Sequence, residues 1–179
     1  MYAIICLGNP GREYENTRHN IGFRVGQALA LRHKIDLGRN RLRCQYGKGK
    51  IVGEDVIIAL PMTFMNLSGD AARRLVDFFK IPIENAVVVY DESALPLGSL
   101  RLRAGGSDAG HKGMRSLSQY LGTENITRVR LGVGGPPAGW EMKDWVLSDF
   151  KKNELESVEE MISTACDAIE TYLKDGLPK

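Results

Sequence analysis

The chain has 179 residues, of which 43% are hydrophobic and 26% charged, and its formal net charge is +2. This length suffices for one domain with its own core and is too short for two well-packed domains. The composition excludes a disordered chain, and no apolar run approaches the roughly 20 residues of a membrane-spanning helix. The three cysteines are widely spaced without a C-x-x-C pair, which favours reduced thiols over disulfides or a zinc ribbon. We therefore expect a soluble cytoplasmic protein.

The charge is unevenly distributed along the chain. Residues 1–140 carry 19 Lys and Arg against 12 Asp and Glu, whereas residues 141–179 carry 5 against 10. The basic excess is densest from Arg18 to Lys50, where nine basic residues accompany one acid, Asp36. Two interpretations are open: a surface that meets phosphates, or a sheet edge and a helix face whose charge the acidic C-terminal segment compensates.

Hydrophobic periodicity predicts strands that alternate with helices, which is typical of an α/β layer structure. The apolar opening has no basic residue and runs into a Gly-Pro loop, so we interpret it as a first strand and not a signal peptide. The predicted strands are residues 2–7, a pair within 50–60 that turns at Gly53 and is closed by Pro61, 86–90, 100–103 and 127–133. Four helices are predicted. The first begins near residue 21, the second has Ser68 as its N-cap and continues through Lys80, and the third begins near His111 or Lys112. The fourth is a long amphipathic helix over about 151–173.

Unusual residues follow the ends of three predicted strands, at 8–11, 91–92 and 132–135. Because ligands of open α/β sheets bind beyond the carboxyl ends of strands, we expect one crevice there.

Several familiar sites are excluded. Residues 8–11 follow a strand but do not form the G-x-G-x-x-G fingerprint of a dinucleotide site. Residues 105–113 imitate a phosphate loop, yet His111 stands where its lysine belongs. The three histidines lack metal-ligand spacing, and there is no G-x-S-x-G serine elbow.

One histidine, one aspartate and two amides remain as candidate chemistry. His19 opens a predicted helix and has an ordinary pKa of roughly 6.5, which suits proton transfer. Asp91 ends an apolar strand and could hold the imidazole in its basic tautomer. Asn9 and Asn66 can bind an amide or an oxyanion. This set suggests water attacking a carbonyl, although a helix-start His, a turn Asn and a capping Asp also have purely structural explanations.

These residues lie in blocks that resemble the ordered motifs of bacterial peptidyl-tRNA hydrolases. The blocks run from residue 2 to about residue 150 and so cover most of the chain. They are Gly8-Asn9-Pro10-Gly11 with Tyr14 and Thr17-Arg18-His19-Asn20, residues 61–69, Asp91-Glu92 with Leu95, Pro96 and Gly98, Gly110-His111 with Gly113 and Ser116, and Arg128, Arg130, Gly132 and Gly134.

The resemblance implies an enzyme that cleaves the ester between a peptide and the 3′ end of tRNA, recycling tRNA from peptidyl-tRNA dropped by ribosomes. It implies His19 as the general base that activates water, oriented by Asp91. Asn9 would separate blocked from unblocked aminoacyl-tRNA, because only a peptidyl group has an amide beside the ester. The implied fold is a single-domain three-layer sandwich over residues 1–179, with a twisted mixed β-sheet flanked by helices.

The remaining implied residues bind substrate. Arg103 and Arg130 would meet the acceptor-stem phosphate, and the residues assigned to the tRNA end and the peptide are Tyr14, Asn20, Phe64, Asn66 and Lys112. The expected partner is the acceptor stem and 3′ end of peptidyl-tRNA, bound by a monomer that uses no metal or cofactor and no membrane.

The sequence departs from the family pattern at two places. Lys112 stands where the family has asparagine, and could grip a phosphate, stabilise an oxyanion, lower the pKa of His19 or extend into solvent. Ser93-Ala94 replaces a second acidic position after Asp91. These departures leave open an RNA-binding protein that resembles a plant chloroplast splicing factor of the same fold, and, less favoured, an esterase that acts on other substrates.

Overall fold

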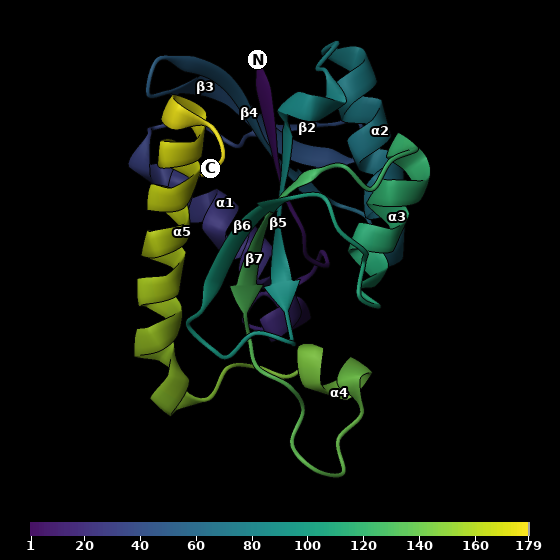
Figure 1. Cartoon of the computed structure of the whole chain (residues 1–179), viewed down its shortest axis with the longest axis vertical. Helices are drawn as coiled ribbons and strands as arrows, with labels where there is room; N and C mark the ends of the chain where they lie inside the picture. Colours follow the sequence, from purple (N-terminus) through teal and green to yellow (C-terminus); the bar gives the residue numbers. More distant parts are fainter. Residues whose placement is uncertain (179) are drawn as a thin grey trace.

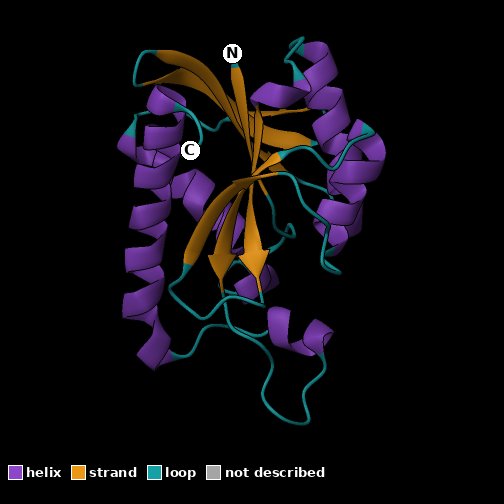
Figure 2. Cartoon of the chain, viewed as in Figure 1, coloured by secondary structure: helices purple, strands orange, loops and turns teal. Residues whose placement is uncertain are grey.

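The computed structural model describes residues 1–178. Within these residues, seven strands form one sheet in the order β2-β3-β4-β1-β5-β7-β6 (Figure 2). The strands are β1 (Tyr2–Cys6), β2 (Arg39–Arg41), β3 (Cys44–Ile51), β4 (Glu54–Pro61), β5 (Ala86–Glu92), β6 (Leu100–Ala104) and β7 (Thr127–Gly132). The central strands β4, β1, β5 and β7 run parallel, and the pairs β3–β4, β2–β3 and β6–β7 are antiparallel. The predicted mixed sheet is confirmed.

Helices cover both faces of this sheet, which gives three layers (Figure 1). The α-helices are α1 (Ile21–Arg32), α2 (Ser68–Phe78), α3 (Lys112–Leu121), α4 (Met142–Val146) and α5 (Leu155–Asp175). Alternate residues of β1 point to opposite faces, so Ile4 and Cys6 join a core with α1 and α5, whereas Ala3 and Ile5 join a core with α2 and α3. A strand buried on both faces reads as a continuous apolar run, which is why residues 2–7 show no alternation.

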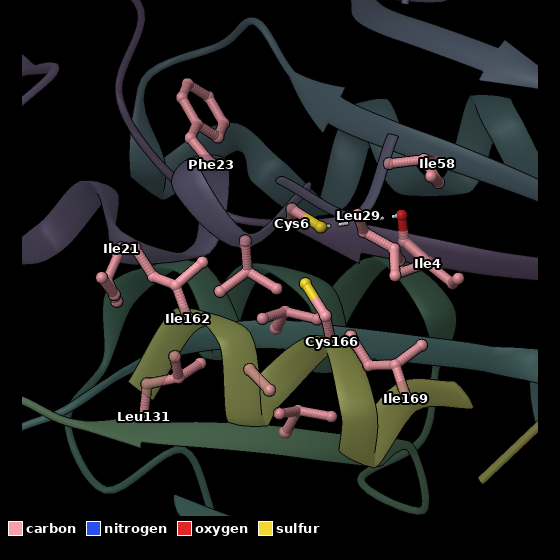
Figure 3. Packing of buried hydrophobic residues seen from close by; sticks show 14 of the residues in the cluster. Ile4, Cys6, Ile21, Phe23, Leu29, Ile58, Leu131, Ile162, Cys166 and Ile169 are labelled. Carbon is pink, nitrogen blue, oxygen red and sulfur yellow. Dashed lines mark hydrogen bonds between the residues drawn. The ribbon is translucent and has the colours of Figure 1, made fainter. Parts of the chain in front are cut away.

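The core beneath α1 and α5 contains two of the three cysteines (Figure 3). Cys6 of β1 and Cys166 of α5 are buried with Leu29, Ile162 and other aliphatic side chains. All three cysteines are free thiols, and burial raises the pKa of Cys166 to about 11. A thiol with so high a pKa is unreactive at neutral pH, so these residues act as core packing.

The acidic C-terminal helix compensates the basic first helix. Arg24 pairs with Glu159 at 2.6 Å, and Arg32 pairs with Asp167 at 2.7 Å and with Glu170 at 3.2 Å. Of the two interpretations of the basic segment, charge compensation is therefore correct for α1, and these arginines do not form a phosphate surface.

Several element boundaries differ from the prediction. Ser68 is not an N-cap, because a 3₁₀ turn (Met65–Leu67) precedes α2 and the Ser68 hydroxyl donates to the Met65 carbonyl at 2.8 Å. The C-terminal helix begins at Leu155 after another 3₁₀ turn (Lys152–Glu154), not at residue 151. Strand β2 and helix α4 were not predicted, since each is too short to show periodicity. Among the described residues, no helix is both long enough and apolar enough to cross a membrane.

Candidate active site

The predicted crevice forms where β1 and β5 end side by side. Both strands are parallel neighbours, so the loop after β1, which holds Asn9, meets the end of β5, which holds Asp91. Helix α1 begins close to both strand ends because Gly22 has no side chain: a Cβ there would lie 2.5 Å from the Val89 carbonyl and 2.6 Å from the Leu7 carbonyl. This close approach brings the preceding 3₁₀ turn (Arg18–Asn20), and with it His19, over Asp91.

His19 and Asp91 are hydrogen-bonded as predicted. His19 Nδ1 lies 2.8 Å from Asp91 Oδ2, and the Asp91 residue is 2% exposed. Burial by itself lowers the pKa of His19, but the charge and hydrogen bond of Asp91 raise it, Lys112 lowers it slightly, and the net shift is upward. The Nδ1 proton points at the carboxylate, which leaves the Nε2 lone pair free to accept a proton.

His111 is a second histidine on the same carboxylate, and sequence reasoning missed it as a site residue. Its Nε2 lies 2.8 Å from Asp91 Oδ1, and its Nδ1 accepts from the backbone N–H groups of Gly113 at 3.1 Å and Met114 at 3.3 Å. His111 is thus the N-cap of α3, and its ring proton is on Nε2. Two signals could have indicated this role: its place directly before a predicted helix, and its place in the block Gly110-His111 that resembles a family motif.

The Asp91 carboxylate, which both histidines contact, is ionised although it is buried. Burial raises the pKa of Asp91, but the two hydrogen-bonded imidazoles outweigh this effect and hold that pKa well below its ordinary value. Asp91 therefore remains ionised and accepts one hydrogen bond on each oxygen.

The ligand atoms of His19, Asp91 and His111 lie within 4.8 Å of one another, a spacing that could hold a metal ion. A ligating imidazole must offer a lone pair to the metal. His111 Nε2 offers none, because two N–H donors keep the proton off Nδ1 and on Nε2. This donor set fits a hydrogen-bonded dyad better than a metal site.

Asn9 lies at the cavity wall and is fixed by three hydrogen bonds. Its side-chain oxygen accepts from the Met65 N–H at 2.8 Å, and Asn20 bonds to both main-chain groups of Asn9 at 2.8 and 2.9 Å. Asn20 is only 2% exposed and does not line the cavity, so the structure places it behind Asn9. With its oxygen engaged, Asn9 has its amino group left to donate to a ligand.

The cavity has a volume of about 650 Å³. Tyr14, Phe64, Asn66 and Lys112 line it with the residues above, and Phe64 is 57% exposed with its ring edge-on to Tyr14 at 6.4 Å. Sequence reasoning missed the opposite wall, because its residues are in or next to the short helix α4. These wall residues are Met142, Lys143, Val146 and Leu147.

Arg18, immediately before His19, holds this wall in place. Its guanidinium is 1% exposed, lies 3.7 Å from the ring centroid of Trp145 in α4, and pairs with Glu154 at 3.1 Å. The Trp145 indole N–H donates to the Gly134 carbonyl at 2.8 Å. The third predicted crevice loop, 132–135, therefore supports α4 and does not line the cavity.

The two predicted phosphate ligands are on β7 and on the edge strand β6, and of these only Arg130 is linked to a cavity residue. Arg130 Nη1 donates to Glu92 Oε1 at 2.9 Å, and Glu92 in turn lines the cavity. Arg103 is exposed and lies directly opposite Arg128 in the antiparallel pair. Neither arginine touches the cavity itself.

Comparison with known proteins gives consistent matches. A family model described as peptidyl-tRNA hydrolase matches residues 3–179. The peptidyl-tRNA hydrolase of Exiguobacterium sibiricum is 48% identical over 173 residues, covering 97% of this chain and 94% of that protein. The one from Carboxydothermus hydrogenoformans is 45% identical over 179 residues, covering 100% and 95%. A crystal structure of peptidyl-tRNA hydrolase from Acinetobacter baumannii matches with a TM-score of 0.91 at 33% identity, covering 97% of this chain and 89% of that one.

Proposed function

We propose a residue-level mechanism for this chain, which belongs to the peptidyl-tRNA hydrolase family and is an ester hydrolase acting on peptidyl-tRNA. His19 Nε2 removes a proton from water, and the oxygen of that water attacks the ester carbonyl that joins the peptide to the 3′ ribose. The observation that carries this assignment is the hydrogen bond from His19 Nδ1 to the ionised, buried Asp91. Asp91 holds the reactive tautomer and stabilises the imidazolium that forms.

The tetrahedral intermediate then breaks its bond to the ribose oxygen. The protonated His19 returns its proton to that oxygen, so the products are a free 3′ hydroxyl and a peptide carboxylic acid that ionises. His111 takes no part in proton transfer, because its Nδ1 caps α3 and its Nε2 proton is bound to Asp91. We assign it to positioning Asp91.

Asn9 selects substrates with a blocked amino end. Its amino group donates to the carbonyl of the amide next to the ester, which is present in a peptidyl group and absent from a free aminoacyl group. Support for this role comes from its fixed orientation, set by Met65 and Asn20. Asn20 therefore acts on substrate through Asn9.

Other cavity residues bind the two arms of the substrate. The exposed Phe64 ring stacks on the terminal adenine or on a peptide side chain, supported by Tyr14 and Asn66. Lys112 stabilises an oxyanion or a phosphate; its place in the cavity lining and the effect of its charge on the pKa of His19 support this role. Arg103 and Arg130 contact the acceptor-stem phosphate and read charge, not sequence.

The whole chain acts as one domain and one monomer in this proposal. Both cores share the central strands, and the C-terminal helix packs on α1 at the other end of the chain, so no part is separable as a second unit. The free thiols and the tRNA substrate fit a cytoplasmic enzyme.

The decisive experiment compares release of tRNA from an N-blocked and an unblocked aminoacyl-tRNA, with EDTA present. We expect cleavage of the blocked form only, and its loss in His19→Ala with tRNA affinity within about threefold of wild type. Near-normal hydrolysis by His19→Ala would rule out the general base. Intact tRNA binding without cleavage by the wild type would instead indicate an RNA-binding descendant, with Lys112 as the first residue to revert to asparagine.

A further inference from the structure

Arg128 is a buried cation without a carboxylate partner among residues 1–178. The Arg128 residue is only 1% exposed. It is two residues before Arg130 on the same strand, and directly opposite the exposed Arg103 of β6. A buried charge is strongly unfavourable unless its donors are all engaged. Burial to this degree excludes contact with RNA, so the alternating arginines of β7 have different tasks.

The guanidinium is satisfied by four main-chain carbonyls. Nη1 donates to Ser107 at 2.8 Å, Nη2 donates to Glu124 at 2.8 Å and also to Gly106, and Nε donates to Ile126 at 3.3 Å. Two of these carbonyls are in the loop between β6 and α3, and two are in the turn between α3 and β7. Arg128 therefore joins the two backbone segments that flank α3.

The loop between β6 and α3 depends on such a fixed point. It contains four residues with positive φ, namely Gly105, Gly106, Ala109 and Gly110. Glycine-rich backbone of this kind has many accessible conformations, so outside contacts must select one. The loop ends at His111, whose N–H donates to the Asp108 carbonyl at 2.8 Å.

The His111 ring also packs against a tyrosine near Arg128. The ring of Tyr90 packs edge-on against the His111 imidazole, with centroids 4.9 Å apart. Burial raises the pKa of the Tyr90 hydroxyl, and the nearby Arg128 charge opposes that rise. His111 thus lies between the loop that Arg128 anchors and the Tyr90 ring, whose hydroxyl is near the Arg128 charge.

We propose that Arg128 is a positioning residue for the hydrolysis: by anchoring the β6–α3 loop it holds His111 where the Gly113 and Met114 N–H groups set its tautomer, and through Asp91 it sets the orientation of His19. This inference rests on the proposed general-base role of His19. Arg128 acts from behind the site and contacts neither substrate nor the reacting atoms.

The test uses Arg128→Met, which keeps side-chain length without donors, and Arg128→Lys, which keeps the charge but cannot span four carbonyls on two segments. Steady-state kinetics on blocked aminoacyl-tRNA, at a temperature where circular dichroism shows both variants folded, should give kcat lower by about 10- to 100-fold for Met and less for Lys. KM should stay within about threefold. Arg103→Met should raise KM instead, and Arg73→Met, on the exposed side of α2, should change neither.

Imidazole ¹⁵N NMR separates positioning from a merely structural role. We expect the His111 signals to change from the single tautomer with the proton on Nε2 to an exchanging mixture in Arg128→Met, while those of His33 stay unchanged. If Arg128→Met does not fold, the same shifts in Arg128→Lys decide. Wild-type kcat in a folded variant, or an unchanged His111 tautomer, would overturn the proposal. The tautomer readout holds even if His19→Ala proves active, so the failures of the two proposals are distinguishable.

Discussion

Asp91 accepts hydrogen bonds from two imidazoles that are donors for different reasons. His111 donates because capping α3 occupies its other nitrogen, and His19 donates because Asp91 is its buried partner. The hydrogen bond from His111 holds the Asp91 carboxylate in place, and this carboxylate in turn orients His19. At the scale of single residues, this asymmetry is what leaves one free Nε2 in the cavity.

The activity should therefore depend on pH through His19. Because its pKa is raised, kcat/KM should increase with pH through a midpoint above about 6.5, as the imidazole loses its proton. In Asp91→Asn the raising charge is gone and burial still lowers the pKa, so the midpoint should shift to lower pH. The plateau should fall by about 10²- to 10⁴-fold. His33→Gln is the control, and an unshifted midpoint in Asp91→Asn would contradict the assignment.

Lys112 affects the same titration with the opposite sign. Its charge lowers the pKa of His19, so Lys112→Asn should shift the kcat/KM midpoint to higher pH and retain activity above it. A pH profile on blocked aminoacyl-tRNA measures both effects, with Arg115→Gln on the same helix as the control. Complete loss of activity would show that Lys112 is itself catalytic.

At the level of secondary-structure elements, helices α2 and α3 approach each other closely at Gly69. Its N–H donates to the Ser116 hydroxyl at 2.9 Å, and a Cβ on Gly69 would lie 2.1 Å from the Ser116 carbonyl oxygen. The α2–α3 packing also fixes the position of the α3 N-terminus, and so of its cap His111. The absence of a side chain at Gly69 thus affects the position of His111 in the candidate active site.

Gly69→Ala should lower the free energy of unfolding by about 1–3 kcal/mol, because two backbones must separate. At an open helical position the same change would stabilise by about 1 kcal/mol. Urea unfolding followed by circular dichroism measures this difference. Arg73→Ala, on the exposed side of the same helix, should stay within about 0.5 kcal/mol; a stabilised Gly69→Ala would refute the close contact.

Over the whole molecule, much of the basic excess is neutralised internally. The α1 arginines pair with α5, and Arg43 and Arg74 share Asp70. Arg128 keeps its charge but is buried, so it does not reach a phosphate either. The arginines beside the cavity that remain for phosphates are few, and Arg130 already has a carboxylate partner in Glu92. We therefore expect electrostatic binding of tRNA by this chain to be local and modest.

The salt dependence of KM should report how many phosphate contacts the chain makes. With Arg103 and Arg130 as the phosphate contacts, the logarithm of 1/KM should fall against the logarithm of salt with a slope of about −2. Arg103→Ala should reduce the slope by about 1, whereas Arg24→Ala should leave it unchanged because Arg24 is on α1, where it faces Glu159 of α5. A slope near zero in the wild type would remove phosphate contacts from the mechanism.

Local sequence patterns are enough to predict the order of most elements and the pairing of His19 with Asp91. Periodicity is a local property, so the alternating strands and helices could be predicted from neighbouring residues. His19 and Asp91 were predicted partners because each occurs in a recognisable motif and strand ends meet at one edge of a parallel sheet. Short segments without periodicity, such as β2 and α4, could not be predicted.

The task of each of several similar residues, in contrast, depends on how the chain folds. Arg103, Arg128 and Arg130 look alike in sequence, yet strand register and the β6–α3 loop bury one of them and leave Arg103 at the surface. His111 became part of the site because its loop returns to Asp91, a contact 20 residues away along the chain. Burial and pairing depend on segments distant in sequence, and hydrogen-bond geometry, not residue type, sets which nitrogen of a histidine carries the proton.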